Sequence, residues 1–567
     1  MSTTAALLEQ AARCEAQLTA PGAPFELVDI DVGGRRLKAY ARAFATLPAL
    51  IDSGREHGDK EFMVYEDDRW SFTRFFAAVD ALAGRLQAEL GIEPGDRIAI
   101  AMRNRPEWAV AFAAIALVGA VPVPLNSFGL RDELFAALHD VAPRLLFCDA
   151  ERHERIANDL AALGIVDVLA ASVPGPDSTS LDFAALIAPG GPSARTPALA
   201  PEDPALILFT SGASSQAKAV LSCQRAICQA MHNIDYIGAI SAMTSPKALE
   251  KLMQSGLAPT TLTAVPLFHV SGLHAQLLAS LRGGRRLVFM RRWDSKRALE
   301  LIRSERITQF NGAPSMVMQL LGEPGFAEAT ASLGGLGLGG AGMPQRVIDD
   351  VLACRPDSLS GIGFGMTESN GVGAAAAGAL FFQRPASSGR LPPIMELRVA
   401  SLDGAALADG AAGELCLRGV SVMDGYWQNP QATTQAVDED GWLHTGDIGY
   451  LDADGFLHVV DRIKDVINRS GEKIASAEIE SCLLQHPQIQ EAVVFAQPDD
   501  VTGEAVVAVV VTRPGAELSP DQVHQHVAGN LAAYKVPRDV HVRSEPLPRN
   551  PSGKLLKRVV KHEYSGA

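Results

Sequence analysis

The sequence lacks the cysteine pattern of a disulfide-linked or zinc-ribbon protein. Its seven cysteines are scattered over 567 residues, and no CxxC pair occurs. Positive charge is also scarce, because 50 Lys and Arg residues stand against 65 Asp and Glu residues, which gives a formal net charge of −15. The acidic balance argues against a nucleic-acid binder that relies on a general basic surface. Dispersed cysteines fit a reducing compartment, so we expect a cytoplasmic protein.

Long hydrophobic runs are almost absent. The longest candidate, Trp108–Leu125, is 18 residues without a charge, but it is rich in alanine and ends in two prolines that interrupt a helix. We therefore expect a buried helix followed by a short strand, and no transmembrane segment. The N-terminal segment carries charges within its apolar pattern, which predicts an amphipathic helix and not a signal peptide.

Several common phosphate and catalytic motifs are missing as well. No GxxxxGK[ST], GxSxG or HExxH occurs, which argues against a Walker NTPase, an α/β-hydrolase and a zincin. The run from Gly335 to Gly340 satisfies GxGxxG, but a segment that makes a poor buried strand precedes it. A lone match of this kind is weak evidence for a dinucleotide site.

Apolar strands alternate with amphipathic helices along most of the chain. Asp96–Ala101, Ala120–Leu125 and Ala205–Thr210 are predicted strands, and this rhythm favours mixed or parallel sheets that helices cover. Pro174–Pro204 is rich in Pro, Gly, Ser and Ala, so we expect a surface connector. After about residue 395, short strands between Gly/Asp turns predict a small β-rich subdomain. A compact unit of about 100 residues follows from Asp465.

Five short motifs carry candidate chemistry. The loop from Thr210 to Lys218 leaves a strand and consists of small and hydroxyl residues, so its backbone can form an anion nest. Gly361–Glu368 combines alternating glycines with a phenylalanine, a threonine and a carboxylate. His444–Asp447, Asp461–Asp465 and Asn550–Lys554 complete the set. Each motif taken alone is as consistent with an ordinary turn as with a binding site.

The order of these motifs is far more specific. Together with Val265–Gly272, Gly339–Gly342, Gly413–Gly419, Gly425–Pro430, Asn468–Ile474 and Tyr534–Pro537, they resemble the adenylate-forming superfamily. That superfamily contains acyl- and aryl-CoA synthetases, adenylation domains of peptide synthetases, and luciferases. The resemblance covers nearly the whole chain, from about residue 45 to 560.

The resemblance implies an α/β fold with two domains. A large N-terminal domain, residues 1–463, would hold stacked mixed α/β sheets and a small β subdomain at about 395–460. A mobile α+β cap domain, residues 464–567, would follow a hinge at Lys464. No carrier domain is evident, and we expect a monomer or a homodimer.

The implied reaction has two steps. A carboxylate attacks the α-phosphorus of Mg²⁺-ATP to give acyl-AMP and pyrophosphate, and the thiol of coenzyme A then displaces AMP. The resemblance implies catalytic roles for His269, Thr367, Glu368 and Lys554, with Glu368 and Thr210 at the metal. The ATP-binding residues that it implies are Thr210, Ser211, Gly212, Ser214, Lys218, Gly340, Ala341, Phe364, Gly365, Met366, Thr367, Asp447, Arg462 and Lys554.

The same resemblance implies two further sites. Arg469, Ser470, Gly471 and Lys473 are candidates for binding coenzyme A in the second step. His269, Val270, Gly339 and Asn370 would line the acyl pocket, although His269 is also consistent with plain packing. Small and apolar residues after Glu368 suit a hydrophobic acid. A medium- or long-chain fatty acid is the leading expectation, and an aryl or aryl-alkanoic acid is the alternative.

The phosphate loop departs from the family pattern. Ala213, Ser215 and Ala217 stand where the family usually has threonine, glycine and proline, and a serine that replaces a positive-φ glycine costs about 1 kcal/mol. We therefore expect weaker ATP use. Three other functions remain open at this point: transfer of the acyl group to a carrier protein or into ring closure, luciferase-type oxygen chemistry, and a degenerate nucleotide-binding homologue.

Overall fold

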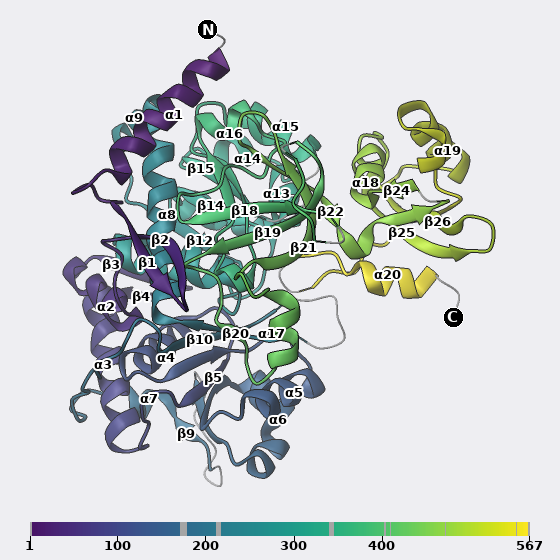
Figure 1. Ribbon diagram of the computed structural model, residues 1–567. Coiled ribbons are helices and arrows are strands. Elements are labelled where there is room, and N and C mark those ends of the chain that lie inside the picture. Colours follow the sequence, from purple (N-terminus) through teal and green to yellow (C-terminus); the bar gives the residue numbers. More distant parts are fainter. Residues whose placement is uncertain are drawn as a thin grey trace.

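The computed structural model describes residues 3–170, 179–210, 217–339, 345–401, 404–408, 410–470, 472–550 and 553–564. Figure 1 shows a large N-terminal domain of sheets and helices, and beside it a smaller C-terminal unit next to β21 and β22. This arrangement confirms the predicted fold class. Within the described residues, no helix combines the length and the apolar character that a membrane crossing needs.

The first large sheet has five parallel strands in the order β6-β5-β7-β8-β9. Buried aliphatic residues fill its strands, as is usual for a parallel sheet covered by helices. The strands are β5 (Arg97–Ala101), β6 (Val121–Pro124), β7 (Leu145–Asp149), β8 (Val166–Ala170) and β9 (Leu181–Asp182). The helices around it are α3 (Phe72–Ala88), α4 (Pro106–Leu117), α5 (Arg131–Val141), α6 (Ala150–Leu163) and α7 (Phe183–Leu186).

The second large sheet has eight strands in the order β17-β16-β15-β14-β12-β13-β3-β4. Its six central strands are parallel, and its two edge strands β4 and β17 are antiparallel. The strands are β3 (Glu61–Tyr65), β4 (Asp68–Ser71), β12 (Thr260–Thr263), β13 (Arg286–Phe289), β14 (Gln309–Gly312), β15 (Gly335–Gly339), β16 (Gly361–Phe364) and β17 (Ala374–Ala377).

Helices connect the strands of this second sheet. They are α8 (Gln224–Thr244), α9 (Pro246–Gln254), α10 (Val270–Gly272), α11 (Ala279–Gly283), α12 (Ser295–Ser304), α13 (Pro314–Leu321), α14 (Phe326–Ala329), α15 (Gln345–Cys354) and α16 (Ala379–Gln383). The π-helical turn η2 (Leu273–Leu278) joins α10 to α11, and the 3₁₀ turn η3 (Thr367–Ser369) follows β16. A π-helical insertion frequently marks a functional region.

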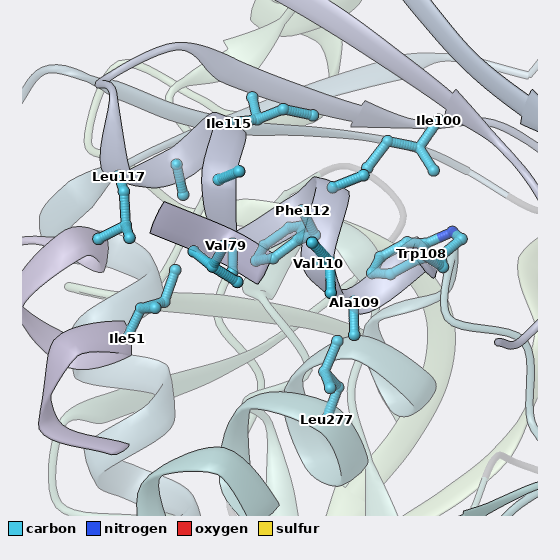
Figure 2. Packing of buried hydrophobic residues seen from close by; sticks show 14 of the residues in the cluster. Ile51, Val79, Ile100, Trp108, Ala109, Val110, Phe112, Ile115, Leu117 and Leu277 are labelled. Carbon is cyan, nitrogen blue, oxygen red and sulfur yellow. The ribbon is translucent and has the colours of Figure 1, made fainter. Parts of the chain in front are cut away.

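Helix α4 lies at the centre of the largest core. Apart from Glu107 in the first turn, its residues are apolar on all sides, which is typical of a helix buried in a core. Figure 2 shows Trp108 and Phe112 packing between α2 (Leu47–Asp52), α3 and η2, and the two rings stack with centroids 5.5 Å apart. The segment Trp108–Leu125 is therefore a buried helix that continues into β6, as the sequence predicts.

Two smaller antiparallel sheets lie next to the parallel ones. The first is β10-β11-β20, with β10 (Pro204–Phe209), β11 (Ala219–Cys223) and β20 (Gly425–Tyr426). The second, β18-β19-β21-β22, is the predicted β-rich subdomain, with β18 (Met395–Ala400), β19 (Gly413–Gly419), β21 (Leu443–Leu451) and β22 (Leu457–Arg462). Helix α17 (Pro430–Ala436) leads into β21.

The N-terminal segments pack on the outside of the large domain. Helix α1 (Thr3–Thr19) buries Ala11, Cys14 and Leu18, which confirms the predicted amphipathic helix. The hairpin β1 (Leu27–Val32) and β2 (Arg35–Tyr40) follows it, and the 3₁₀ turn η1 (Ser53–His57) comes after α2.

The C-terminal domain has a core of its own around strands β25 and β26. Its sheet runs β24-β23-β26-β25, and β27 also pairs with β26. The strands are β23 (Ile467–Arg469), β24 (Glu472–Ile474), β25 (Ile489–Asp499), β26 (Gly503–Thr512) and β27 (Asp539–Arg543). The helices and turns are η4 (Ile463–Asp465), α18 (Ser476–Leu484), α19 (Pro520–Asn530), η5 (Ala533–Lys535) and α20 (Lys557–Tyr564).

One local prediction needs correction. Part of Pro174–Pro204 is not a surface connector, because β9 adds to the first sheet and α7 buries Phe183 in the main core. The glycine-rich run that begins at Gly335 forms the strand β15 itself. Glycine suits this strand because a Cβ on Gly337 would lie 2.0 Å from the Asn311 Oδ1.

Candidate functional site

The predicted phosphate loop connects β10 to β11, which pair as an antiparallel hairpin. Thr210 and Lys218 close its base, because the Thr210 amide donates to the Lys218 carbonyl at 2.9 Å and the Lys218 amide donates to Thr210 Oγ1 at 3.0 Å. The predicted ATP contacts Ser211, Gly212 and Ser214 lie outside the described residues, as do Ser215, Gly340, Ala341 and Gly471. The hairpin therefore fixes the position of the Lys218 backbone.

Lys218, Tyr426 and Glu368 form a connected group from three separate segments. The Lys218 Nζ lies 4.6 Å from the centroid of the Tyr426 ring, and the Tyr426 hydroxyl donates to Glu368 Oε1 at 2.8 Å. Burial and the neighbouring Glu368 carboxylate raise the pKa of Tyr426 above its ordinary value, so the hydroxyl keeps its proton and acts as a donor. This group places a cation and a carboxylate beside each other, as a metal–phosphate site requires.

The segment after β16 presents backbone and a hydroxyl to the site. Gly365 is exposed, and Met366 and Thr367 are partly exposed. A Cβ on Gly365 would lie 2.3 Å from the Gly371 carbonyl oxygen, so only glycine fits there. The Phe364 ring is 5% exposed and belongs to a core cluster, so its contact with adenine stays a prediction.

Asp447 and Arg462 face each other across the β21–β22 ladder. They are register partners, and the Arg462 Nε lies 3.1 Å from Asp447 Oδ1. Asp447 is only 3% exposed, and burial raises the pKa of its carboxyl group, against the opposing effect of the Arg462 and Lys554 charges. Its Oδ1 receives no hydrogen bond of good geometry from the described residues. A buried carboxylate with free acceptor capacity fits the two hydroxyls of a ribose.

A second carboxylate supports the turn before Asp447. Glu414 on β19 contacts the His444 Nδ1 through Oε2 at 3.0 Å and accepts from the Gly446 amide through Oε1 at 3.3 Å. The Thr445 hydroxyl donates to the Leu415 carbonyl at 2.7 Å and accepts from the Asp447 amide at 3.1 Å. Each residue of the His444–Asp447 motif is therefore fixed to β19 or to its own turn.

The Lys554 loop of the C-terminal domain docks on the large domain. Within the loop, the Lys554 amide donates to Asn550 Oδ1 at 2.8 Å. Across the domain junction, the Ser315 hydroxyl on α13 donates to the Gly553 carbonyl at 3.2 Å. A Cβ on Gly553 would lie 2.7 Å from the Ser315 oxygen, and its φ of +83° also favours glycine. The glycine before Lys554 thus allows the close approach of the two domains.

The Lys554 amine lies in the field of several charged groups. Loss of solvation lowers its pKa to about 8, with Arg462 and Lys464 acting in the same direction and Asp447 in the opposite one. Burial, together with the nearby charge of Lys554, lowers the pKa of His269 to about 4. His269 is therefore neutral at pH 7, and the charge of Lys554 influences both His269 and the Asp447 carboxylate.

The predicted acyl pocket residues come from three segments. Val270 lies against Gly371, whose Cβ position is 3.2 Å from a Val270 methyl group. The Asn370 amide donates to Ser222 Oγ at 2.9 Å and to the Ser421 carbonyl at 3.0 Å, so that group holds neighbouring chain segments together. Gly339 ends β15 and has open space at its Cβ position.

The predicted coenzyme A residues and the hinge lie further along the chain. Lys464 is in the turn η4 between β22 and β23. Arg469 donates to the Tyr534 carbonyl at 2.8 Å and to the Val536 carbonyl at 3.2 Å, which fixes its guanidinium within the C-terminal domain. Ser470 has a φ of +53°, and Lys473 is exposed on β24. Their roles stay predictions.

Two residues of the site were missed at the sequence level. Tyr426 is part of a motif that supports the resemblance, yet its link to Glu368 depends on β20 pairing with β11. Ser315 carries no motif and contacts the Lys554 loop from 238 residues away. The Pro-Ser start of α13 gives no signal of such a contact.

These elements define an α/β protein with a large N-terminal domain and a smaller C-terminal domain, which has the fold of adenylate-forming enzymes. Residues 50–427 match the family model of AMP-binding enzymes, and residues 478–554 match the model of their C-terminal domain. The chain belongs to the AMP-binding enzyme family.

Named relatives agree with this assignment. The chain is 31% identical over 491 residues to 4-coumarate–CoA ligase 3 of Oryza sativa subsp. japonica, which covers 85% of this chain and 86% of the relative. The o-succinylbenzoate CoA synthetase of Bacillus subtilis, solved with its acyl-adenylate intermediate, matches with a TM-score of 0.75 and 26% identity over 91% of this chain and 99% of the other. The amide bond synthetase McbA of Marinactinospora thermotolerans matches with a TM-score of 0.79, 26% identity and the same coverage.

The protein is accordingly an AMP-forming acid–CoA ligase that uses ATP and coenzyme A as substrates. The side chains present fit this chemistry, because the buried carboxylate of Asp447 can accept hydrogen bonds from a ribose and the carboxylate of Glu368 suits Mg²⁺. A bound Mg²⁺ would neutralise charge on the phosphates. The relatives named above do not support the expected preference for fatty acids.

Proposed function

We propose that the acid is an aromatic or arylalkenoic carboxylic acid that carries a polar ring substituent, and that Lys554 and His269 receive its carboxylate. Lys554 presents a cation to the point where the carboxylate must meet the α-phosphate. His269 is neutral, so it adds no competing charge. The names of the relatives, which include 4-coumarate and o-succinylbenzoate ligases, support an aromatic acid.

One buried side chain near the predicted acyl pocket supports a polar substituent. Gln276 on η2 is 1% exposed, and its Nε2 donates to the Asn311 carbonyl at 3.2 Å. Its Oε1 is buried and has no hydrogen-bond partner among the described residues. Asn311 in turn lies directly against Gly337, which is on the same strand as the predicted pocket residue Gly339.

An unpaired buried acceptor is costly, so it favours a substrate that supplies a donor. A phenolic hydroxyl would donate to Gln276, whereas an alkyl chain or an unsubstituted ring would leave the oxygen unpaired. A site built to hydrogen-bond a hydroxyl discriminates strongly against the analogue that lacks it. This reasoning favours hydroxylated aromatic acids over fatty acids of similar length.

The test compares 4-coumarate, cinnamate and decanoate in a coupled assay for CoA-dependent AMP release. We expect kcat/KM to fall in that order, with 4-coumarate ahead of cinnamate by about tenfold or more. In Gln276→Met, which keeps the length of the side chain, the advantage of 4-coumarate over cinnamate should shrink while cinnamate is used as before. Decanoate as the best substrate would overturn the proposal and restore the fatty-acid expectation.

A further inference from the structure

A cluster of side chains with metal-binding groups lies in the β subdomain, next to the turn that precedes Asp447. Its members are Glu414 and Cys416 on β19 and His444 on β21. The ligand atoms of the three residues lie within 4.8 Å of one another. A thiol, an imidazole and a carboxylate are the side-chain groups that bind Zn²⁺ in proteins. The cluster is therefore a candidate zinc site.

Strand geometry brings these groups to one face of the sheet. Glu414 and Cys416 are two residues apart on β19, so their side chains point to the same face. Cys416 and His444 are register partners, and the ladder shifts register between Cys416 and Glu414, where β21 has extra residues. Such bulges re-aim side chains and are common beside functional sites. The cluster thus depends on strand pairing, which explains why no sequence motif reveals it.

The separations within the cluster fit a tetrahedral zinc ion. The Cys416 sulfur lies 3.6 Å from His444 Nδ1, and that nitrogen lies 3.0 Å from Glu414 Oε2. Zn–S bonds of ~2.3 Å and Zn–N bonds of ~2.0–2.1 Å place a sulfur and a nitrogen ligand about 3.6 Å apart. The thiol and the imidazole already have this spacing, and the carboxylate needs to move away from the imidazole by roughly 0.4 Å.

Two neighbouring charges support the cluster. His444 Nε2 lies 3.8 Å from Asp438 Oδ2, and metal-binding histidines typically direct their second ring nitrogen toward a carboxylate. Arg398, the register partner of Cys416 on β18, pairs with Asp438 at 2.9 Å and favours the thiolate form of Cys416. Because Arg398 offsets the charge of Asp438, the carboxylate of Glu414 and an ionised Cys416 would match the charge of a divalent ion.

An ion can reach the cluster from solvent. The side chains of His444 and Glu414 are 28% and 15% exposed, and Cys416 is fully buried beneath them. Burial raises the pKa of the Cys416 thiol to about 11, so the thiol keeps its proton until a metal ion replaces it. Binding would release that proton to solvent. The proton between His444 Nδ1 and Glu414 would move to Nε2, beside Asp438.

The cluster is coupled to the ribose turn. Glu414 accepts from the Gly446 amide through Oε1 at 3.3 Å, and Gly446 directly precedes Asp447. An ion that displaces the Glu414 carboxylate therefore also displaces this turn. We propose that Glu414, Cys416 and His444 bind Zn²⁺, and that the bound ion weakens ATP binding by shifting Asp447. This site is distinct from the Mg²⁺ that accompanies ATP, because Mg²⁺ prefers oxygen ligands.

Metal titration tests the site directly. Co²⁺ held by a thiolate shows sulfur-to-metal charge-transfer absorption, which oxygen ligands alone do not give. We expect this band in the wild-type protein with one equivalent of Co²⁺, and its loss when Zn²⁺ is added in excess. Cys416→Ser should abolish the band. Glu414→Gln, which keeps an acceptor for the Gly446 amide, should weaken Zn²⁺ binding by about tenfold or more in competition with a chromophoric chelator.

Matched controls come from outside the cluster. Cys354→Ser removes a more accessible cysteine, and His458→Gln breaks a histidine–carboxylate pair that has no thiol, in which Nε2 lies 2.9 Å from Asp452. Both controls should keep the band. A wild-type protein without the band, or a band that persists in Cys416→Ser, would overturn the metal site.

ATP–pyrophosphate exchange tests the link to the ribose turn. With Mg²⁺ in excess, Zn²⁺ should raise the KM for ATP about tenfold in the wild-type protein. In Cys416→Ser the KM for ATP should stay at the value that this variant has without zinc. The comparison cancels direct binding of Zn²⁺ to ATP, because both proteins are assayed with the same nucleotide and metal. Zn²⁺ that binds the cluster without changing the KM for ATP would overturn the proposed effect on Asp447.

Discussion

Replacing Lys554 by alanine should separate the two half-reactions. The Lys554 loop is held by backbone groups, through Asn550 within the loop and Ser315 across the junction. The substitution therefore removes the amine and leaves the docking contacts in place. Losing one preorganised donor or cation at a developing charge typically slows a reaction by ~10²–10³, or ~2.7–4 kcal/mol. We expect adenylation to slow by that factor.

Two assays measure the two steps. ATP–pyrophosphate exchange reports adenylation, and single-turnover reaction of presynthesised acyl-AMP with coenzyme A reports thioester formation. The second should stay close to the wild-type rate, because Lys554 faces the adenylation site and has no assigned role once AMP is the leaving group. Equal losses in both assays would refute the assignment, since they would indicate a general defect in domain docking.

Three further substitutions test other parts of the site. Lys464→Pro, which restricts φ at the hinge and the conformation of Ile463 before it, should leave pyrophosphate exchange largely intact and slow thioester formation by about tenfold or more; an unchanged overall rate would exclude a rotation at Lys464. Asp447→Asn should raise the KM for ATP about tenfold to a hundredfold and should reduce the preference for ATP over 2′-deoxy-ATP. If the variant kept the wild-type preference for ATP over 2′-deoxy-ATP, Asp447 would not be the residue that binds the ribose. Tyr426→Phe removes the 2.8 Å hydrogen bond from Tyr426 to Glu368. About tenfold more Mg²⁺ should therefore be needed for half-maximal pyrophosphate exchange. An unchanged Mg²⁺ requirement would show that Tyr426 does not support the metal site.

Much of this fold could be predicted because the local pattern of apolar and polar residues determines which segments form buried helices and strands. The charge-free segment from Trp108 ends in prolines, and it forms a buried helix and strand as expected. The alternating strands and helices likewise predict the parallel sheets. The segment Pro174–Pro204 was misjudged, because β9 and α7 are short and lie among Pro, Gly and Ser residues. Their burial depends on α3 and β8, which no local pattern reveals.

Site residues could be predicted from the sequence only where they belong to a recognisable motif. Asp447 and Arg462 are both in motifs, and the β21–β22 register brings them together. The contacts that complete the site have no such signal. Tyr426 reaches Glu368 through strand pairing, and Ser315 reaches Gly553 through domain docking.

The lowered pKa of Lys554 predicts that ATP binding is coupled to proton uptake by its amine. With a pKa of about 8, the amine is about half protonated at pH 8 in the free enzyme. ATP brings negative charge beside it, which favours the charged form and raises the pKa. Binding at pH 8 should therefore take up about half a proton through Lys554, whereas at pH 6.5 the amine is already protonated and the uptake should vanish.

Calorimetry of Mg²⁺-ATP binding in buffers of different ionisation enthalpy measures this uptake directly. Because ATP itself exchanges protons, the informative quantity is the difference between the wild-type protein and Lys554→Ala at each pH. The sign follows from the cause: loss of solvation, together with Arg462 and Lys464, disfavours the charged amine, and a bound anion offsets these effects. A difference of zero at pH 8 would mean that Lys554 keeps its full charge without nucleotide. The amine would then lie outside the field of those two cations, and its assignment to the α-phosphate would lose its electrostatic basis.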